Sequence, residues 1–172
     1  CYRRKPMRRK DREITDFKTI KMIIEQSDCI RLGFIDCGEV YIIPLNYGYE
    51  EIDGRFIFYF HGAGKGRKID LIQKNPKAGF ELDTNHSLIS GNTACSYGYA
   101  YRSIIGTGTV QFVNNTEEKK HALTLLMKHH TGKTDWHFGE ADINSVCVFK
   151  LTVINMTAKE RPMPGQHEPE NT

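Results

Sequence analysis

Residues 56–80 narrow the possible folds more than any other stretch of the chain. Five consecutive strand-forming residues, 56–60, open this stretch, and a polar, glycine-rich corner follows at residues 61–66. Two adjacent cations then begin a short helical pattern, which ends at Pro76 because proline has no amide hydrogen and restricts the residue before it. The stretch therefore predicts a strand, a tight corner and a helix in immediate succession.

The two cations at the predicted helix start are Arg67 and Lys68. Backbone amides at a helix N-terminus point outward without partners, and the helix dipole favours negative charge there. Arginine can bind a phosphate through two parallel hydrogen bonds, and lysine binds it as a point charge. The corner therefore has the elements of a phosphate site. The spacing alone also allows the more common alternative, a solvated basic turn between a strand and a helix.

Hairpin signals dominate the rest of the chain, at Asp36-Cys37-Gly38-Glu39 and at Asp53-Gly54. No strand–helix–strand alternation is present, which argues against a doubly wound sheet. We expect a mainly β (α+β) fold, a six-stranded antiparallel barrel, closed or split, with flanking helices. Expected strands are residues 29–36, 40–49, 56–60, 77–83, 96–113 and 145–158; expected helices are 16–27, 67–75 and 116–130; expected loops are 84–94 and 131–142.

The second expected strand contains Pro44, which cannot donate to a sheet ladder. Proline occurs in sheets at edges or at bulges, and such interruptions often lie where a ligand meets the backbone. We therefore expect this strand to lie at an edge or to carry a bulge.

A chain of 172 residues is most simply one domain, long enough to bury a core. We divide it into a basic N-terminal arm (1–13), a folded domain (14–158) and a polar, proline-containing tail (159–172). Seven of the first twelve residues are Arg or Lys. A basic arm can bind nucleic acid or an anionic membrane, but it is more often a solvated terminus, and we expect neither partner here.

No apolar run approaches the roughly 20 residues that span a bilayer, and no secretory pattern follows the N-terminal charges. Five cysteines without C-x-x-C spacing argue against a disulfide framework and against zinc. The seven histidines do not form a metal-ligand pattern either. We expect reduced thiols, a cytoplasmic protein and no metal site.

Four blocks of the sequence together resemble the pyridoxamine-phosphate-oxidase-like flavin proteins, and most closely their 5-nitroimidazole-resistance branch. The blocks occur in family order within about residues 7–158, and together they are more specific than any one alone. They are residues 7–14, 44–49, 61–68 and 101–108.

The resemblance implies a six-stranded split barrel that forms a homodimer, with a flavin in each cleft between subunits. The flavin is usually FMN, and FAD is the alternative. By position, Arg67 and Lys68 would hold the phosphate, and Trp136 would come from the other subunit. The other implied cofactor contacts are Pro44, Leu45, Asn46 and Tyr47 along the ring, His61 and Gly62 beside the flavin, and Ser103 and Ile105 at the phosphate or ribityl chain.

The resemblance also implies a flavin-dependent reductase of small molecules such as 5-nitroimidazoles, with NADH or NADPH as the electron donor. His61 would stabilise the reduced ring or donate a proton. The alternative is a flavin- or haem-binding carrier or sensor without turnover, because a fold does not determine a function. The substrate-binding C-terminal segment of the wider oxidase family is not recognisable here, which argues against oxidation of pyridoxamine phosphate.

Overall fold

The computed structural model describes residues 7–165, and this part of the chain contains eight strands and four α-helices. The strands are β1 (Glu13–Ile14), β2 (Ile30–Asp36), β3 (Glu39–Leu45), β4 (Gly48–Ile52), β5 (Arg55–Gly62), β6 (Lys77–Ile89), β7 (Gly98–Val113) and β8 (Cys147–Arg161). The helices are α1 (Phe17–Gln26), α2 (Arg67–Lys74), α3 (Thr116–Thr131) and α4 (Glu140–Ser145), with 3₁₀ turns η1 (Lys10–Arg12) and η2 (Ala94–Ser96).

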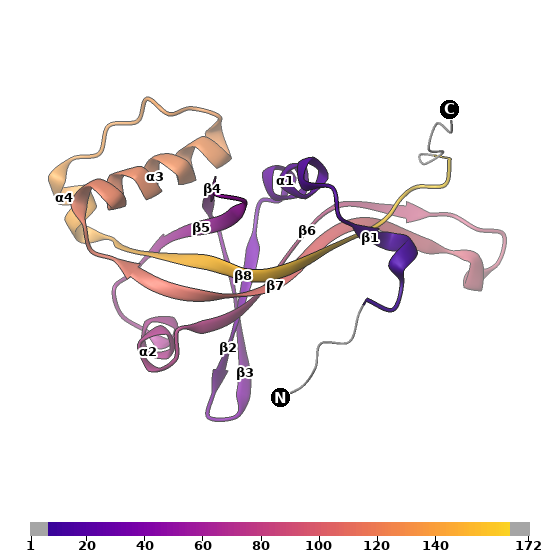
Figure 1. Cartoon of the computed structure of the whole chain (residues 1–172), viewed down its shortest axis with the longest axis horizontal. Coiled ribbons are helices and arrows are strands. Elements are labelled where there is room, and N and C mark those ends of the chain that lie inside the picture. Colours follow the sequence, from indigo (N-terminus) through magenta and orange to yellow (C-terminus); the bar gives the residue numbers. More distant parts are fainter. Residues whose placement is uncertain (1–6, 166–172) are drawn as a thin grey trace. The chain divides into compact units, whose positions relative to one another are not determined.

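The strands form one sheet in the order β3-β2-β6-β7-β8-β5-β4, and β1 pairs with β8 (Figure 1). The pairs β2–β3, β2–β6, β4–β5 and β5–β8 are all antiparallel. The mainly β, antiparallel fold is therefore as predicted, but the number of strands is eight instead of six. The two additional strands are the short β1 and a second strand within residues 40–52.

Two compact units make up the chain. The larger unit comprises residues 28–82 and 105–156, and the smaller unit contains the described residues 7–27, 83–104 and 157–165. All the predicted site residues except Ser103 belong to the larger unit.

In the smaller unit, α1 begins where the sequence predicts. Asp16 is its N-cap, and its carboxylate accepts a hydrogen bond from the Thr19 amide at 2.8 Å. Ile23 and Ile24 are fully buried, as the apolar spacing indicates. Residues 10–13, expected to belong to a charged arm, instead form η1 and the first residue of β1. Residues 1–6 of the predicted arm and 166–172 of the predicted tail lie outside the described residues.

The loop predicted at residues 84–94 is wrong over its first half, because β6 continues to Ile89. This part of β6 is rich in polar side chains, and most of them are exposed. Backbone hydrogen bonds to the long strand β7, its neighbour in the sheet, stabilise β6. Composition therefore indicated a loop where sheet pairing determines a strand.

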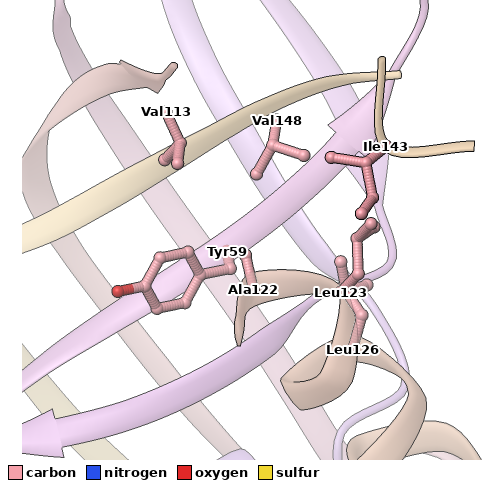
Figure 2. Close-up of a cluster of buried hydrophobic side chains, with 7 residues drawn as sticks. All are labelled: Tyr59, Val113, Ala122, Leu123, Leu126, Ile143 and Val148. Carbon is pink, nitrogen blue, oxygen red and sulfur yellow. The ribbon is translucent and has the colours of Figure 1, made fainter. Parts of the chain in front are cut away.

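A compact apolar cluster forms the part of the larger unit that lies under α3 (Figure 2). The α3 side contributes Ala122, Leu123 and Leu126, which pack against strand residues and against Ile143 of α4. Tyr59 of β5 is buried in this cluster, and its hydroxyl donates to Glu50 Oε1 at 2.6 Å. The Tyr59 hydroxyl therefore has a hydrogen-bond partner although the ring is buried. The same carboxylate also contacts His121 Nε2 at 2.8 Å.

The predicted strand 40–49 is broken at Asn46 and Tyr47, which separate β3 from β4. Tyr47 is fully buried, and its ring lies 5.4 Å from that of Phe58 and 4.6 Å from that of His129. Burial of this ring turns the chain inward between the two strands. At the start of β4, Gly48 allows α3 to approach closely, because an added Cβ would lie 2.3 Å from the Leu126 amide nitrogen.

Helix α3 follows the sequence prediction at its first turn, where the Asn115 side chain accepts from the Glu118 amide at 3.0 Å. It ends at Gly132, which has a φ of 72°. The predicted loop 131–142 is shorter than expected, because α4 begins at Glu140. Within the described residues, none of the helices has the length and apolar character needed to cross a membrane.

Candidate functional site

The corner after β5 is held by the sheet on one side and by α2 on the other. His61 and Gly62 are the last residues of β5, and both pair with the first residues of β8. The chain leaves the sheet after Gly62 and turns at Gly66, whose φ of 115° lies in a region that residues with a side chain rarely adopt. Helix α2 begins at the next residue, Arg67, as the sequence predicts.

The N-terminus of α2 is fixed in place but is not capped by a side chain. Ile69, Leu71 and Ile72 are buried and anchor the helix. Its C-terminus is at Asn75, whose amide donates to the Leu71 carbonyl at 2.8 Å. The N-cap residue is Gly66, so no side-chain oxygen accepts from the amides of the first turn. These amides and the helix dipole leave positive potential at the corner.

Lys68 is the half-buried cation at this corner, and it has no acidic partner among the described residues. Its Nζ atom lies 2.7 Å from the point where a Cβ on Gly62 would be. The ammonium is also 5.9 Å from the centre of the Phe149 ring. Within residues 7–165, no carboxylate lies within ion-pair distance of it. A half-buried, unpaired ammonium is costly, and an anion at this point would compensate its charge.

Arg67 is held differently, by the turn between β2 and β3. Its Nε donates to Asp36 Oδ2 at 2.8 Å, and its guanidinium carbon lies 4.6 Å from the centre of the Tyr41 ring. The hydrogen bond from Arg67 lowers the pKa of Asp36 below its ordinary value, so this carboxylate is ionised at neutral pH.

His61 lies near Lys68, and the charge of Lys68 acts on the imidazole. Partial burial of the imidazole lowers the pKa of His61 below its ordinary value, and the positive charge of Lys68 lowers it further. At neutral pH the ring is therefore mainly uncharged. An uncharged imidazole donates a hydrogen bond through one nitrogen and accepts one through the other.

The residues predicted to run along a flavin ring lie at the end of β3 and just beyond it. Strand β3 ends the sheet order, which confirms that Pro44 is on an edge strand. The β2–β3 register is continuous through Pro44 and Leu45, so no bulge is present there. Pro44 and Asn46 are exposed, whereas the Tyr47 side chain is fully buried in the core. A ligand could therefore reach Tyr47 only through its backbone.

The three remaining predicted residues belong to other elements. Ile105 is on β7 and is 57% exposed. Trp136 is in the loop after α3, is 44% exposed, and donates from Nε1 to Thr131 Oγ1 at 3.3 Å. Among the described residues, no hydrogen bond or ring contact joins Trp136 to the corner. Ser103 is half-buried on β7 and belongs to the smaller unit.

Apolar side chains gather on one open face of the larger unit. A groove of about 560 Å³ on this face is lined by Ile35, Val40 and Ile154, with Lys77 and Thr107 among its polar contributors. The three apolar side chains are each at least 60% exposed. Exposure of a contiguous apolar cluster to water is unfavourable, and such clusters on a protein surface often mark interaction sites.

Two residues of the site escaped the sequence analysis, Asp36 and Tyr41. Asp36 was interpreted only as part of a hairpin turn, and Tyr41 only as a strand residue. Each lies more than 25 positions from Arg67 along the chain, so no local pattern connects them. Only the folding of the β2–β3 hairpin against α2 brings them to the arginine.

Comparison with known proteins gives the same fold. The sequence pattern of a family described as pyridoxamine 5'-phosphate oxidase matches residues 16–160. A candidate 5-nitroimidazole antibiotic resistance protein from Bacteroides thetaiotaomicron has a similar crystal structure, with a TM-score of 0.75 and 32% identity over 86% of each chain. No curated protein matches the sequence.

Two more distant structures also resemble the chain. The flavocytochrome Anf3 from Azotobacter vinelandii has a TM-score of 0.75 and 17% identity, over 96% of this chain and 76% of its own. The FAD- and haem-binding protein from Mycobacterium smegmatis has the same TM-score and 12% identity, over 91% and 77%. At these identities the likeness concerns the fold alone. Together, the comparisons confirm the split-barrel fold class that the sequence predicts.

Proposed function

Because this chain belongs to the pyridoxamine 5'-phosphate oxidase family, we propose that it binds a flavin and uses it to reduce small nitro compounds. One observation supports the flavin most directly: a half-buried lysine without an acidic partner stands beside an uncapped helix N-terminus. This is the arrangement that a phosphate monoester requires.

The residues at the corner fit the phosphate of FMN. Lys68 would contact it with its ammonium, and Arg67 with its two terminal amino groups. Gly62 keeps open the space that Lys68 occupies, since a Cβ there would overlap the ammonium. FMN ends in a single phosphate, so we propose FMN as the cofactor and FAD as the alternative.

The edge strand β3 would lie along the ring of the flavin. Pro44 has no amide hydrogen and is exposed, and it presents a flat apolar surface against which a ring can pack. A bound flavin would supply the hydride and electron transfer from NADH or NADPH to a nitro group. The mainly uncharged His61 would stand near the ring and hold a proton or a hydrogen bond during turnover.

We propose that a second copy of the chain covers the apolar face described above. Exposed Ile35, Val40 and Ile154 would be removed from water, and Trp136 of the second copy would close the flavin cleft. Substituting Ile154 by Glu should convert the dimer to a monomer in analytical ultracentrifugation. The control is Ile52→Glu, an exposed apolar residue that does not line the groove. Monomeric wild-type protein would contradict the proposal.

Nitro compounds are proposed as substrates because the Bacteroides protein, 32% identical, is described as a candidate 5-nitroimidazole resistance protein. Full reduction of the nitro group to an amine would remove the reactive intermediates of these drugs.

The test begins with the absorption spectrum of the purified protein and the mass of what heat releases from it. The flavin is then reduced without oxygen by NADH or NADPH, and a 5-nitroimidazole is added. We expect reduction of the flavin and its reoxidation by the drug, with an amine as the product once three equivalents of NADH or NADPH have supplied the six electrons that the nitro group takes up. A bound flavin that the drug never reoxidises would contradict the reductase. Failure of both nicotinamides to reduce the flavin would favour a carrier or sensor without turnover.

A further inference from the structure

We propose that the turn between β2 and β3 positions Arg67 for the phosphate of the flavin. In this view, which rests on the proposed function, Asp36 holds the Nε atom and Tyr41 supports the flat face of the guanidinium. Asp36 and Tyr41 would be positioning residues that act through Arg67 and do not touch the cofactor themselves.

The contacts of Arg67 leave its phosphate-binding atoms available. Nε donates to Asp36 at 2.8 Å, and the Tyr41 ring lies 4.6 Å from the guanidinium carbon. In the part of the chain that the structure describes, the two terminal amino groups make no hydrogen bond. The Asp36 side chain is 21% exposed and that of Arg67 is 54% exposed, so the carboxylate is sheltered while the arginine remains accessible. Two parallel donors on one flat group match two phosphate oxygens.

The hairpin places both supporting residues on one face. Cys37 and Gly38 have φ values of 52° and 90°, so they form a tight turn with left-handed backbone at both positions. In the β2–β3 register, Asp36 lies opposite Glu39 and Phe34 lies opposite Tyr41. Residues directly opposite each other share a face, as do residues two apart on one strand. Asp36 and Tyr41 are therefore diagonal neighbours on the same face, spaced to receive one guanidinium.

Such support has a physical advantage. An exposed arginine samples many rotamers, and fixing them on binding has an entropic cost. A guanidinium already held at Nε and against a ring has lost most of that freedom before the phosphate arrives. The arrangement also has a disadvantage, since an ionised Asp36 repels a phosphate. The two effects predict opposite results when the carboxylate is removed, so the sign of the change decides between them.

The experiment measures FMN and riboflavin binding to apo-protein by quenching of flavin fluorescence. Riboflavin lacks the phosphate and serves as the internal control. The variants are Asp36→Asn, Asp36→Ala, Tyr41→Leu and Glu39→Ala. Glu39 is an exposed carboxylate opposite Asp36 that makes no contact with Arg67, so its removal reports the loss of negative charge alone. Circular dichroism confirms that each variant is folded.

We expect Asp36→Ala and Tyr41→Leu to weaken FMN binding by about two- to fivefold, the upper part of the range measured for exposed ion pairs. Asp36→Asn should weaken it less, because its amide oxygen still accepts from Nε. Riboflavin binding should be unchanged in all three variants, and Glu39→Ala should not weaken FMN binding.

Tighter or unchanged FMN binding by both Asp36 variants would overturn the inference and leave the proposed function intact. Equal losses for FMN and riboflavin would also overturn it, because they would indicate general damage to the cleft. A wild-type protein that binds neither flavin removes the proposed function, and the inference with it. These results are distinguishable in one set of titrations.

Discussion

Replacement of Lys68 by Met removes the half-buried, unpaired charge of the corner while keeping the length of the side chain. A phosphate monoester carries a charge of about −1.5 to −2 at neutral pH. One pair of unit charges about 4 Å apart interacts by about 1 kcal/mol in bulk water and about 4 kcal/mol at an effective dielectric constant of 20. Lys68 is half-buried, which places it in the lower part of this range. We expect a loss of about 1–2 kcal/mol, or roughly 5- to 30-fold in FMN affinity.

The assay compares FMN with riboflavin on apo-protein and includes Lys65→Met as the matched control. Lys65 is exposed in the same corner and makes no ion pair with any described residue. Only Lys68→Met should weaken FMN binding strongly, and riboflavin binding should change little in either variant. A second readout needs no cofactor. Because the charge of Lys68 contributes to the low pKa of His61, this pKa should rise in Lys68→Met when it is followed by NMR.

Three results would refute this reasoning. Equal effects of Lys65→Met and Lys68→Met would mean that the corner acts only through its net charge. Equal losses for FMN and riboflavin would mean that Lys68 does not contact the phosphate. An unchanged His61 pKa would mean that the ammonium does not lie where the overlap with a Gly62 Cβ places it.

Gly48→Ala should lower the free energy of unfolding by about 1–3 kcal/mol in urea denaturation, because its Cβ would meet the backbone of α3. Gly33→Ala is the control and should be nearly neutral, since its nearest neighbour is at 3.9 Å. Tyr59→Phe should cost about 1–2 kcal/mol at neutral pH. Burial opposes ionisation of Glu50, but its hydrogen bonds lower its pKa below the ordinary value. The ionised Glu50 therefore stabilises the fold above its unfolded pKa, and this stability is lost as the pH falls through the folded pKa. The cost of Tyr59→Phe should accordingly shrink in acid. Trp136 is the only tryptophan, so FMN binding should quench tryptophan emission, and unchanged emission would place this residue away from the flavin.

Helix ends were predictable because the interactions that determine them are local. Asp16 caps α1 and Asn115 caps α3 through hydrogen bonds to amides three residues away. The end of α2 at Asn75 follows from the proline after it. The strand breaks were not predictable in this way. Tyr47 interrupts a continuous strand pattern because its ring packs on His129, more than eighty positions later in the chain.

The extension of β6 is a second case in which local sequence did not predict where a strand ends: here the strand continues where a loop was expected. Residues 84–87 are polar, and 84–89 were predicted as part of a loop, but β6 lies beside β7 in the sheet over this part of the chain. Propensity describes a residue in isolation, whereas pairing depends on what lies beside it. Composition therefore understated the length of a strand that the sequence otherwise predicts.

The order of residues by itself determined the corner: an aromatic strand, a run of glycines, two cations and a helix that a proline ends. These features follow from backbone sterics and from spacing within about ten residues. Only the tertiary structure decided which of the two cations, Arg67 or Lys68, forms an ion pair. The β2–β3 hairpin brings Asp36 to Arg67, while the lysine folds back over Gly62 and meets no carboxylate among the described residues. An ion pair between residues 31 positions apart depends on how two elements pack, and no local pattern of charges encodes it.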